Sequence, residues 1–153
     1  MVLRFAGIAL SACLLSACAT GTPVTSAAPD ELNEPLAAGT ADPVAGQRLF
    51  VAREGGHCVL CHQVSGLDAA FQGNLGPGLD GIGTRLNTAQ IRLRVVDSSL
   101  LNPDTIMPAY YRTEGLEQVA EEYRGKTVLT GQQVEDIVAW LATLRGDEGD
   151  AGS

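Results

Sequence analysis

The sequence lacks three features that would place it in large classes of protein. It has no run of alternating apolar and polar residues and no internal repeat, so a helical protein is expected rather than a sheet or a solenoid. Beyond its first residues, no apolar stretch is long enough for a transmembrane helix. Lys and Arg number only 10 against 18 Asp and Glu, and this acidity argues against nucleic acid or an anionic lipid surface as a partner.

The first seventeen residues have the features of an export signal. Arg4 gives a positive start, residues 6–15 form a short apolar run, and Leu-Ser-Ala before Cys18 resembles a bacterial lipobox. We therefore expect residues 1–17 to be removed, Cys18 to be lipidated, and the protein to be periplasmic and held to a membrane only by this lipid. The alternative is an ordinary secretory signal cut near Ala19, which also predicts export.

The four cysteines do not form an even set available for disulfides. Cys13 lies in the signal, Cys18 is expected to carry lipid, and Cys58 and Cys61 stand directly before His62. The pattern C-x-x-C-H is the attachment signature of c-type haem. Two thiols three residues apart on one turn can reach both vinyl groups of a porphyrin, while the adjacent imidazole faces the iron. We predict one covalent haem c, with His62 as an axial ligand.

Three other sites could use the same residues. A thioredoxin-like pair would follow a strand and open a long helix, and no β-rich context surrounds this motif. A zinc site would need four ligands, and His57, Cys58, Cys61 and His62 are crowded into six residues with no distant pair. A disulfide would leave His62 without a role. His57 itself is expected to be a partly exposed surface residue.

Met107 is the candidate for the second axial ligand of the iron. It is the only methionine besides the initiator, and it lies 45 residues after His62. Pro103 and Pro108 flank it and block helix on either side, which suits a rigid loop across a haem. The alternative is a methionine that fills the core. His/Met ligation leaves no open coordination position and stabilises Fe(II), which favours electron transfer at a relatively high potential.

The rest of the chain divides into a tether, a domain and a tail. Residues 18–42 are rich in Ala, Thr, Pro and acidic residues and lack aromatics, which predicts a disordered tether. Residues 43–146 are expected to form the cytochrome domain, and residues 147–153 an acidic tail. Within the domain, apolar spacing and capping residues predict three helices. These are 43–54 with an Asp42 cap and Pro43 at its start, 88–96 with Asn87 and Gln90, and 131–145 with Thr130, Gln133 and a terminal Gly146.

Three segments, residues 73–83, 102–116 and 129–139, carry a closer resemblance. They are similar to SoxX, the family of small monohaem cytochromes found in the SoxAX complex of bacterial sulfur oxidation. The resemblance spans about residues 44–145 and implies the all-α class I cytochrome c fold. In that fold the first and last helices cross, which Gly46, Phe50 and Trp140 would suit. A proline carbonyl supports the proximal histidine there, and Pro77 matches this position.

The resemblance also implies partners and a reaction. SoxA, a second haem protein, would form a heterodimer with this chain. Thiosulfate would be joined oxidatively at SoxA to a cysteine of the SoxY–SoxZ carrier, an L-cysteine S-thiosulfotransferase reaction. This chain would be the non-catalytic subunit that accepts the two electrons singly and passes them to a downstream cytochrome. Tyr110, Tyr111 and Arg112, which follow Met107 closely, would pack at the haem edge or at the SoxA interface. The alternative for the two tyrosines is packing in the core.

Two other functions stay open on sequence. The first is a free-standing, membrane-tethered cytochrome c that feeds an oxidase or a photosynthetic reaction centre. The second is a sensor or enzyme in which Met107 is an exchangeable ligand, which would bind carbon monoxide when reduced.

Overall fold

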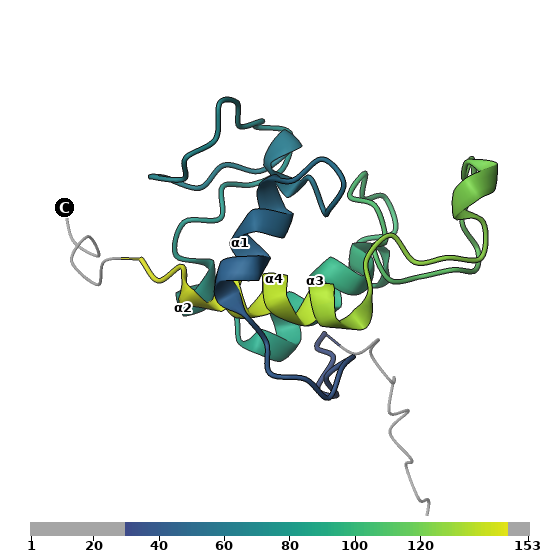
Figure 1. Ribbon diagram of the computed structural model, residues 1–153, viewed down its shortest axis with the longest axis horizontal. Helices are drawn as coiled ribbons and strands as arrows, with labels where there is room; N and C mark the ends of the chain where they lie inside the picture. The colour runs from purple at the N-terminus through teal and green to yellow at the C-terminus, as the bar shows by residue number, and fades with distance from the viewer. Residues whose placement is uncertain (1–29, 147–153) are drawn as a thin grey trace, which may run out of the picture.

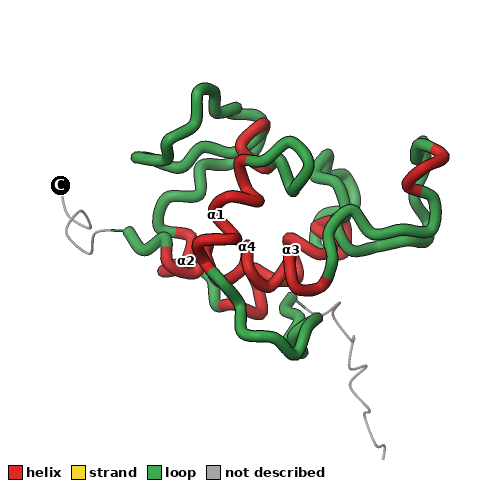
Figure 2. Tube along the Cα trace, viewed as in Figure 1, coloured by secondary structure: helices red, strands yellow, loops and turns green. Residues whose placement is uncertain are grey.

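The fold consists of helices joined by long loops (Figures 1 and 2). The computed structural model describes residues 30–146, so the predicted signal, Cys18 and the acidic tail lie outside the described residues. No strand occurs within that range, which confirms the prediction of an all-α protein, and none of its helices has the length and apolar character to cross a membrane. The helices are α1 (Pro43–Val51), α2 (Ile82–Arg85), α3 (Thr88–Asp97) and α4 (Gly131–Thr143), with 3₁₀ turns η1 (Cys58–Leu60), η2 (Ser98–Leu100) and η3 (Glu121–Tyr123).

The helix starts follow the predicted caps. The Asp42 side chain accepts a hydrogen bond from Val44 N at 2.8 Å, and Pro43 occupies the first turn of α1. Both predicted capping boxes form at the starts of α3 and α4. In each, the side chain of the capping residue accepts a hydrogen bond from the backbone N–H of the glutamine three residues later, and the glutamine side chain accepts one from the backbone N–H of the capping residue. The local sequence therefore fixes where each of these three helices begins.

Two helix ends differ from the prediction. α1 ends at Val51 rather than at residue 54, because Ala52 is extended and the following turn is closed by Gly56 N donating to Leu49 O. α4 ends at Thr143, since Leu144 already leaves the helical conformation. The prediction of Gly146 as its C-terminal cap is therefore wrong.

The first and last helices cross at Gly46, as the resemblance implied. Gly46 is buried, and a methyl group there would overlap the Asp136 carbonyl and lie 2.9 Å from Ile137 N, so the two backbones touch. One turn further along α1, the Phe50 ring packs on Trp140 with ring centroids 4.8 Å apart. The crossing fixes the direction of α1. The cysteine motif follows soon after the helix, since α1 ends at Val51 and the motif begins at Cys58.

Residues 30–42, which we call the strap, pack on α3 and α4. Leu32 N donates to Ala89 O at 3.0 Å, Leu36 N to a Glu135 oxygen at 2.9 Å, and Asp42 N to an Asp136 oxygen at 2.9 Å. The prediction of a disordered tether is therefore wrong for residues 30–42. Composition could not reveal this, because the contacts use backbone groups that every residue carries.

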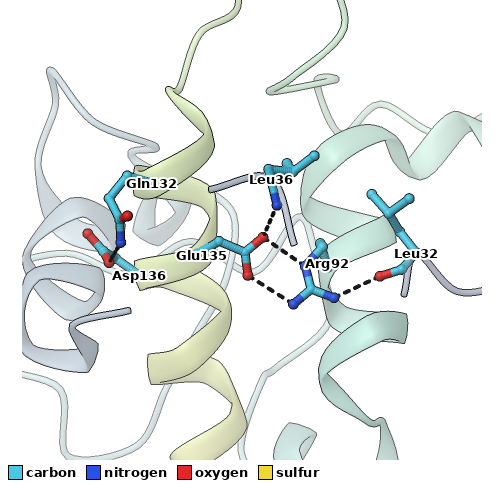
Figure 3. A network of polar contacts seen from close by, with 6 residues as sticks. All are labelled: Leu32, Leu36, Arg92, Gln132, Glu135 and Asp136. Atoms are coloured by element: carbon cyan, nitrogen blue, oxygen red, sulfur yellow. Dashed lines mark hydrogen bonds and ion pairs between the residues drawn. The ribbon is translucent and has the colours of Figure 1, made fainter. Parts of the chain in front are cut away.

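A buried ion pair anchors the strap (Figure 3). Arg92 Nε and Nη2 donate to the two oxygens of Glu135 at 2.8 and 2.9 Å, and Nη1 donates to Leu32 O at 2.7 Å. The two side chains are only 8% and 7% exposed. A second contact follows one turn away, where Gln132 Nε2 donates to Asp136 and to Thr40 O. The strap, α3 and α4 thus share one polar network.

We expect acid to loosen this network and destabilise the domain. Burial alone would raise the pKa of Glu135, but the hydrogen bonds from Arg92 and Leu36 and the charge of Arg92 lower it below the ordinary 4.5. A carboxyl whose pKa is lower in the folded state contributes stability above its unfolded pKa and loses it as the pH falls through the folded value. Denaturant midpoints should therefore fall below about pH 4.5. In Glu135→Gln the denaturant midpoint should fall less between neutral and acid pH, because glutamine does not titrate. An equal fall of the midpoint in both proteins would show that Glu135 is not the group responsible.

Candidate haem site

The C-x-x-C-H motif lies on a tight turn shortly after α1. His57, which is half-buried, precedes η1 in the left-handed conformation with φ 46°. Cys61 N and His62 N both donate to Cys58 O, at 3.0 and 2.9 Å. In such a turn residues three apart lie on the same side, so the two cysteines face one way, as two bonds to one porphyrin require. The predicted partial exposure of His57 is confirmed.

The two thiols have the properties of attachment sites rather than of a redox pair. Neither forms a disulfide within the described chain, and both residues are half-buried. Burial raises the pKa of Cys58 to about 12, so its thiol is protonated at neutral pH. A thioredoxin-like cysteine needs a lowered pKa instead. Among residues 30–146, no three His, Cys, Asp or Glu side chains gather as a metal site.

The His62 imidazole is oriented through one of its two nitrogens. Nδ1 lies 2.8 Å from the carbonyl oxygen of Pro77, the residue to which the resemblance gave this role. With the proton on Nδ1, that nitrogen donates to the carbonyl and Nε2 keeps its lone pair free for a metal. No residue of the described chain hydrogen-bonds to Nε2. The ring is therefore prepared for a ligand on its Nε2 side.

A glycine-rich segment lies along the motif and holds the ring. Gly73 N donates to Val59 O at 2.9 Å, and Gly76 N donates to Cys61 O at 2.8 Å. A Cβ atom on Gly76 would come within 2.7 Å of His62 Nδ1 and 2.9 Å of Nε2. Only glycine lets the backbone lie this close to the imidazole, so Gly76 and Pro77 together limit how the ring can turn.

Met107 lies half-buried in a loop, residues 101–109, that we call the methionine loop. Its N–H donates to Thr105 Oγ1 at 3.2 Å. Just past the loop, the Tyr110 hydroxyl donates to Gly56 O at 2.8 Å, two residues before Cys58. Burial raises the pKa of Tyr110, so this hydroxyl keeps its proton. Tyr110 therefore ties the end of the methionine loop to the segment that carries the cysteine motif.

Several large apolar side chains beside these residues face solvent. Leu60, between the two cysteines, is 53% exposed; Leu75, next to Gly76, is 68% exposed; and Ile106, next to Met107, is 72% exposed. Each of these three side chains is next in sequence to a residue of the candidate haem site. Two thiols three residues apart, a free imidazole nitrogen, a thioether and exposed apolar side chains are together the chemistry that a haem needs. The residues present therefore fit the group.

Sequence reasoning missed the side chains that shape the chain between His62 and Pro77. Gln72 Oε1 accepts from Val64 N at 2.7 Å, and Asp80 accepts from both the N–H and the hydroxyl of Ser65 at 2.8 Å. The partners lie eight and fifteen residues apart. Such single bonds within a loop leave no periodic signal in the sequence.

Comparison with known proteins identifies the family of the domain that follows the strap. Residues 43–145 match the family model described as cytochrome c. The crystal structure of SoxXA from P. pantotrophus contains a similar chain, with a TM-score of 0.70 and 34% identity, covering 76% of this chain and 90% of that one. The c-type cytochrome SorU from Sinorhizobium meliloti is similar at 23% identity and a TM-score of 0.44, covering 68% and 91%. No curated protein matches the sequence.

Proposed function

Because this chain belongs to the cytochrome c family and is a SoxX-like cytochrome, we propose that it is the electron-accepting subunit of a SoxAX-type enzyme. The class I cytochrome c fold predicted from the sequence is confirmed, and with it an electron-transfer protein with covalently bound haem c. The observation that carries the finer proposal is the likeness to the SoxXA chain. It extends over nearly all of that chain, beyond what the cysteine motif alone would produce.

We assign the site residues as follows. Cys58 and Cys61 would hold the haem covalently through their sulfur atoms, and His62 and Met107 would ligate its iron. When bound, the haem supplies a one-electron Fe(III)/Fe(II) couple. Pro77 O holds the Nδ1 proton of His62, which keeps Nε2 aimed at the metal and makes it a better donor.

The partner in this proposal is a SoxA-like cytochrome in a heterodimer. There a sulfur–sulfur bond forms between thiosulfate and a cysteine thiol of a SoxY–SoxZ carrier, which releases the thiol proton and two electrons. This chain takes the electrons one at a time and passes them to a downstream cytochrome. The reaction belongs to the complex, and this chain supplies no residue to the sulfur chemistry. An exported protein, lipid-anchored through Cys18, would do this work at the periplasmic face of a membrane.

We expect the chain, purified from its native host in mild detergent, to bring a second c-type cytochrome with it. Thiosulfate added to the oxidised sample should then reduce its haem only when SoxY–SoxZ is present, because the electrons come from the coupling to the carrier cysteine. The absorption of reduced haem measures this directly. The matched control is SoxY–SoxZ with its cysteine alkylated, which should leave the haem oxidised.

Other outcomes would replace the proposal. A chain that purifies alone and stays oxidised, yet exchanges electrons with other cytochromes, would be a free-standing tethered carrier. Carbon monoxide binding to the reduced native protein would indicate an exchangeable Met107 and a sensor or enzyme instead.

A further inference from the structure

Among the described residues, the hydrogen bonds that tie the methionine loop to the rest of the protein start from its first two residues. Its hydrogen bonds link Met107 to Thr105, Thr105 to Asn102, and Asn102 to Ser98 at the end of α3. Apart from the bonds that Leu101 N and Asn102 N donate to Ser98 O, none of the hydrogen bonds formed by residues 101–109 reaches a described residue outside the loop. The position of Met107 therefore depends on how firmly the ends of the loop are joined to each other and to the core.

A charged cluster joins the two ends. Arg112, just past the loop, places Nη1 2.9 Å from Asp97 Oδ2 and donates to Ser99 Oγ at 3.1 Å. Asp97, just before the loop, accepts from Ser99 N at 3.0 Å through its other oxygen. The residues beside the pair are joined as well, since Tyr111 N donates to Val96 O at 3.2 Å. The chain before the loop and the chain after it thus meet at Asp97 and Arg112.

The pair is costly to break. The Asp97 side chain is 5% exposed, although the Arg112 side chain that pairs with it is 37% exposed, so the carboxylate is the buried member of the pair. An uncompensated buried charge destabilises the arrangement that holds it. Arg112 Nε is buried without a partner among residues 30–146, so within that range the guanidinium makes one ion pair, with Asp97, and one hydrogen bond, to Ser99 Oγ. Both polar contacts of the Arg112 guanidinium within residues 30–146 therefore lie at the base of the methionine loop.

We propose that the Asp97–Arg112 pair is a clasp that closes the base of the methionine loop and sets how readily Met107 leaves the iron. The inference rests on the proposed His62/Met107 ligation. With the clasp intact, the two loop ends are fixed and the thioether stays near its axial position. With the clasp broken, the loop gains conformations, and the effective concentration of the thioether at the metal falls. Asp97 and Arg112 are positioning residues, since neither is assigned to the haem.

The test uses imidazole as a competing ligand for the oxidised holoprotein. Imidazole binds iron only after Met107 has left, so its apparent affinity reports the fraction of open loop. Arg112→Gln should bind imidazole at least about tenfold more tightly than the native protein, because it leaves the Asp97 charge unpaired. It should also weaken the far-red absorption band of a thioether bound to ferric haem. Asp97→Asn, which keeps an oxygen for Ser99 N, should act in the same direction.

A matched control is Arg124→Gln, because Arg124 pairs with Glu121 in an exposed position and should leave imidazole affinity unchanged. Equal affinity in native protein, Arg112→Gln and Asp97→Asn would overturn the clasp. If Arg112→Gln does not fold, Asp97→Asn and Arg112→Lys decide the question, since lysine keeps the charge but loses the planar fork. A native protein without the thioether band, or a Met107→Ala variant that keeps it, would instead overturn the ligation by Met107.

Discussion

Gly46→Ala should destabilise the domain by at least about 2 kcal/mol. In an ordinary helix the change would stabilise, since alanine is favoured over glycine by roughly 1 kcal/mol. Here the new methyl would overlap the Asp136 carbonyl, which is a backbone atom that no side-chain rotation can move. α1 and α4 would have to separate, and the packing of Phe50 on Trp140 would be lost with the crossing. Overpacking should therefore outweigh helix propensity. A lower free energy of unfolding in Gly46→Ala would indicate overpacking, and a higher one would indicate helix propensity.

The measurement is denaturant unfolding of the holoprotein, followed by far-ultraviolet circular dichroism. The matched control is Gly78→Ala, where an added Cβ would meet no atom within 4 Å and the change should stay within about 0.5 kcal/mol. A stabilised Gly46→Ala protein would show that the two helices can move apart without cost.

Breaking the Arg92–Glu135 pair on one side should cost about 3–5 kcal/mol. Arg92→Met leaves a carboxylate in a site from which water is excluded, and Glu135→Leu leaves a guanidinium there. Changing both residues together removes both charges, so the loss in the double variant should be much smaller than the sum of the two single losses. What remains is the cost of leaving the Leu32 carbonyl and the Leu36 N–H of the strap without their partners, about 1–3 kcal/mol for each group that stays buried.

A double-mutant cycle on the free energy of unfolding measures this coupling. Arg124 and Glu121 serve as the control pair, because their side chains are mostly exposed and their coupling should be below about 1 kcal/mol. Strictly additive losses for Arg92 and Glu135 would show that the two charges are not acting on each other, despite their contact at 2.8 Å.

The helix starts and the cysteine motif could be predicted from the sequence, because both depend on residues close to one another along the chain. The caps of α1, α3 and α4 involve residues two or three apart, and the cysteine motif is one turn long, so spacing alone is informative. The end of α1 was misplaced because a turn closed by Gly56 and Leu49 competes with one more turn of helix. Arg92 and Glu135 lie 43 residues apart, and no local pattern pairs them.

The polar contacts of the haem site join residues that are distant along the chain, so they could not be predicted from local spacing. The bond between His62 and Pro77 was expected only through resemblance to a family, because nothing in the spacing alone selects that carbonyl. The Asp97–Arg112 contact was not expected at all, since it depends on the path of the methionine loop. Tyr110 could belong to the core or to a surface on sequence grounds, and its bond to Gly56 O places its hydroxyl inside the fold.

The strap changes how far the domain could travel from a membrane. A free chain from Cys18 to residue 42 could extend to about 80 Å, at roughly 3.3–3.6 Å per residue. Because the chain is fastened from Leu32 onward, the span left between a lipid on Cys18 and the folded domain cannot exceed about 50 Å. The strap lies below α4 in Figure 1, whereas the end of α1 that leads into the cysteine motif points upward. If Cys18 carries the proposed lipid, attachment on that side would keep the domain close to the membrane, with the end of α1 that leads into the cysteine motif facing away from it.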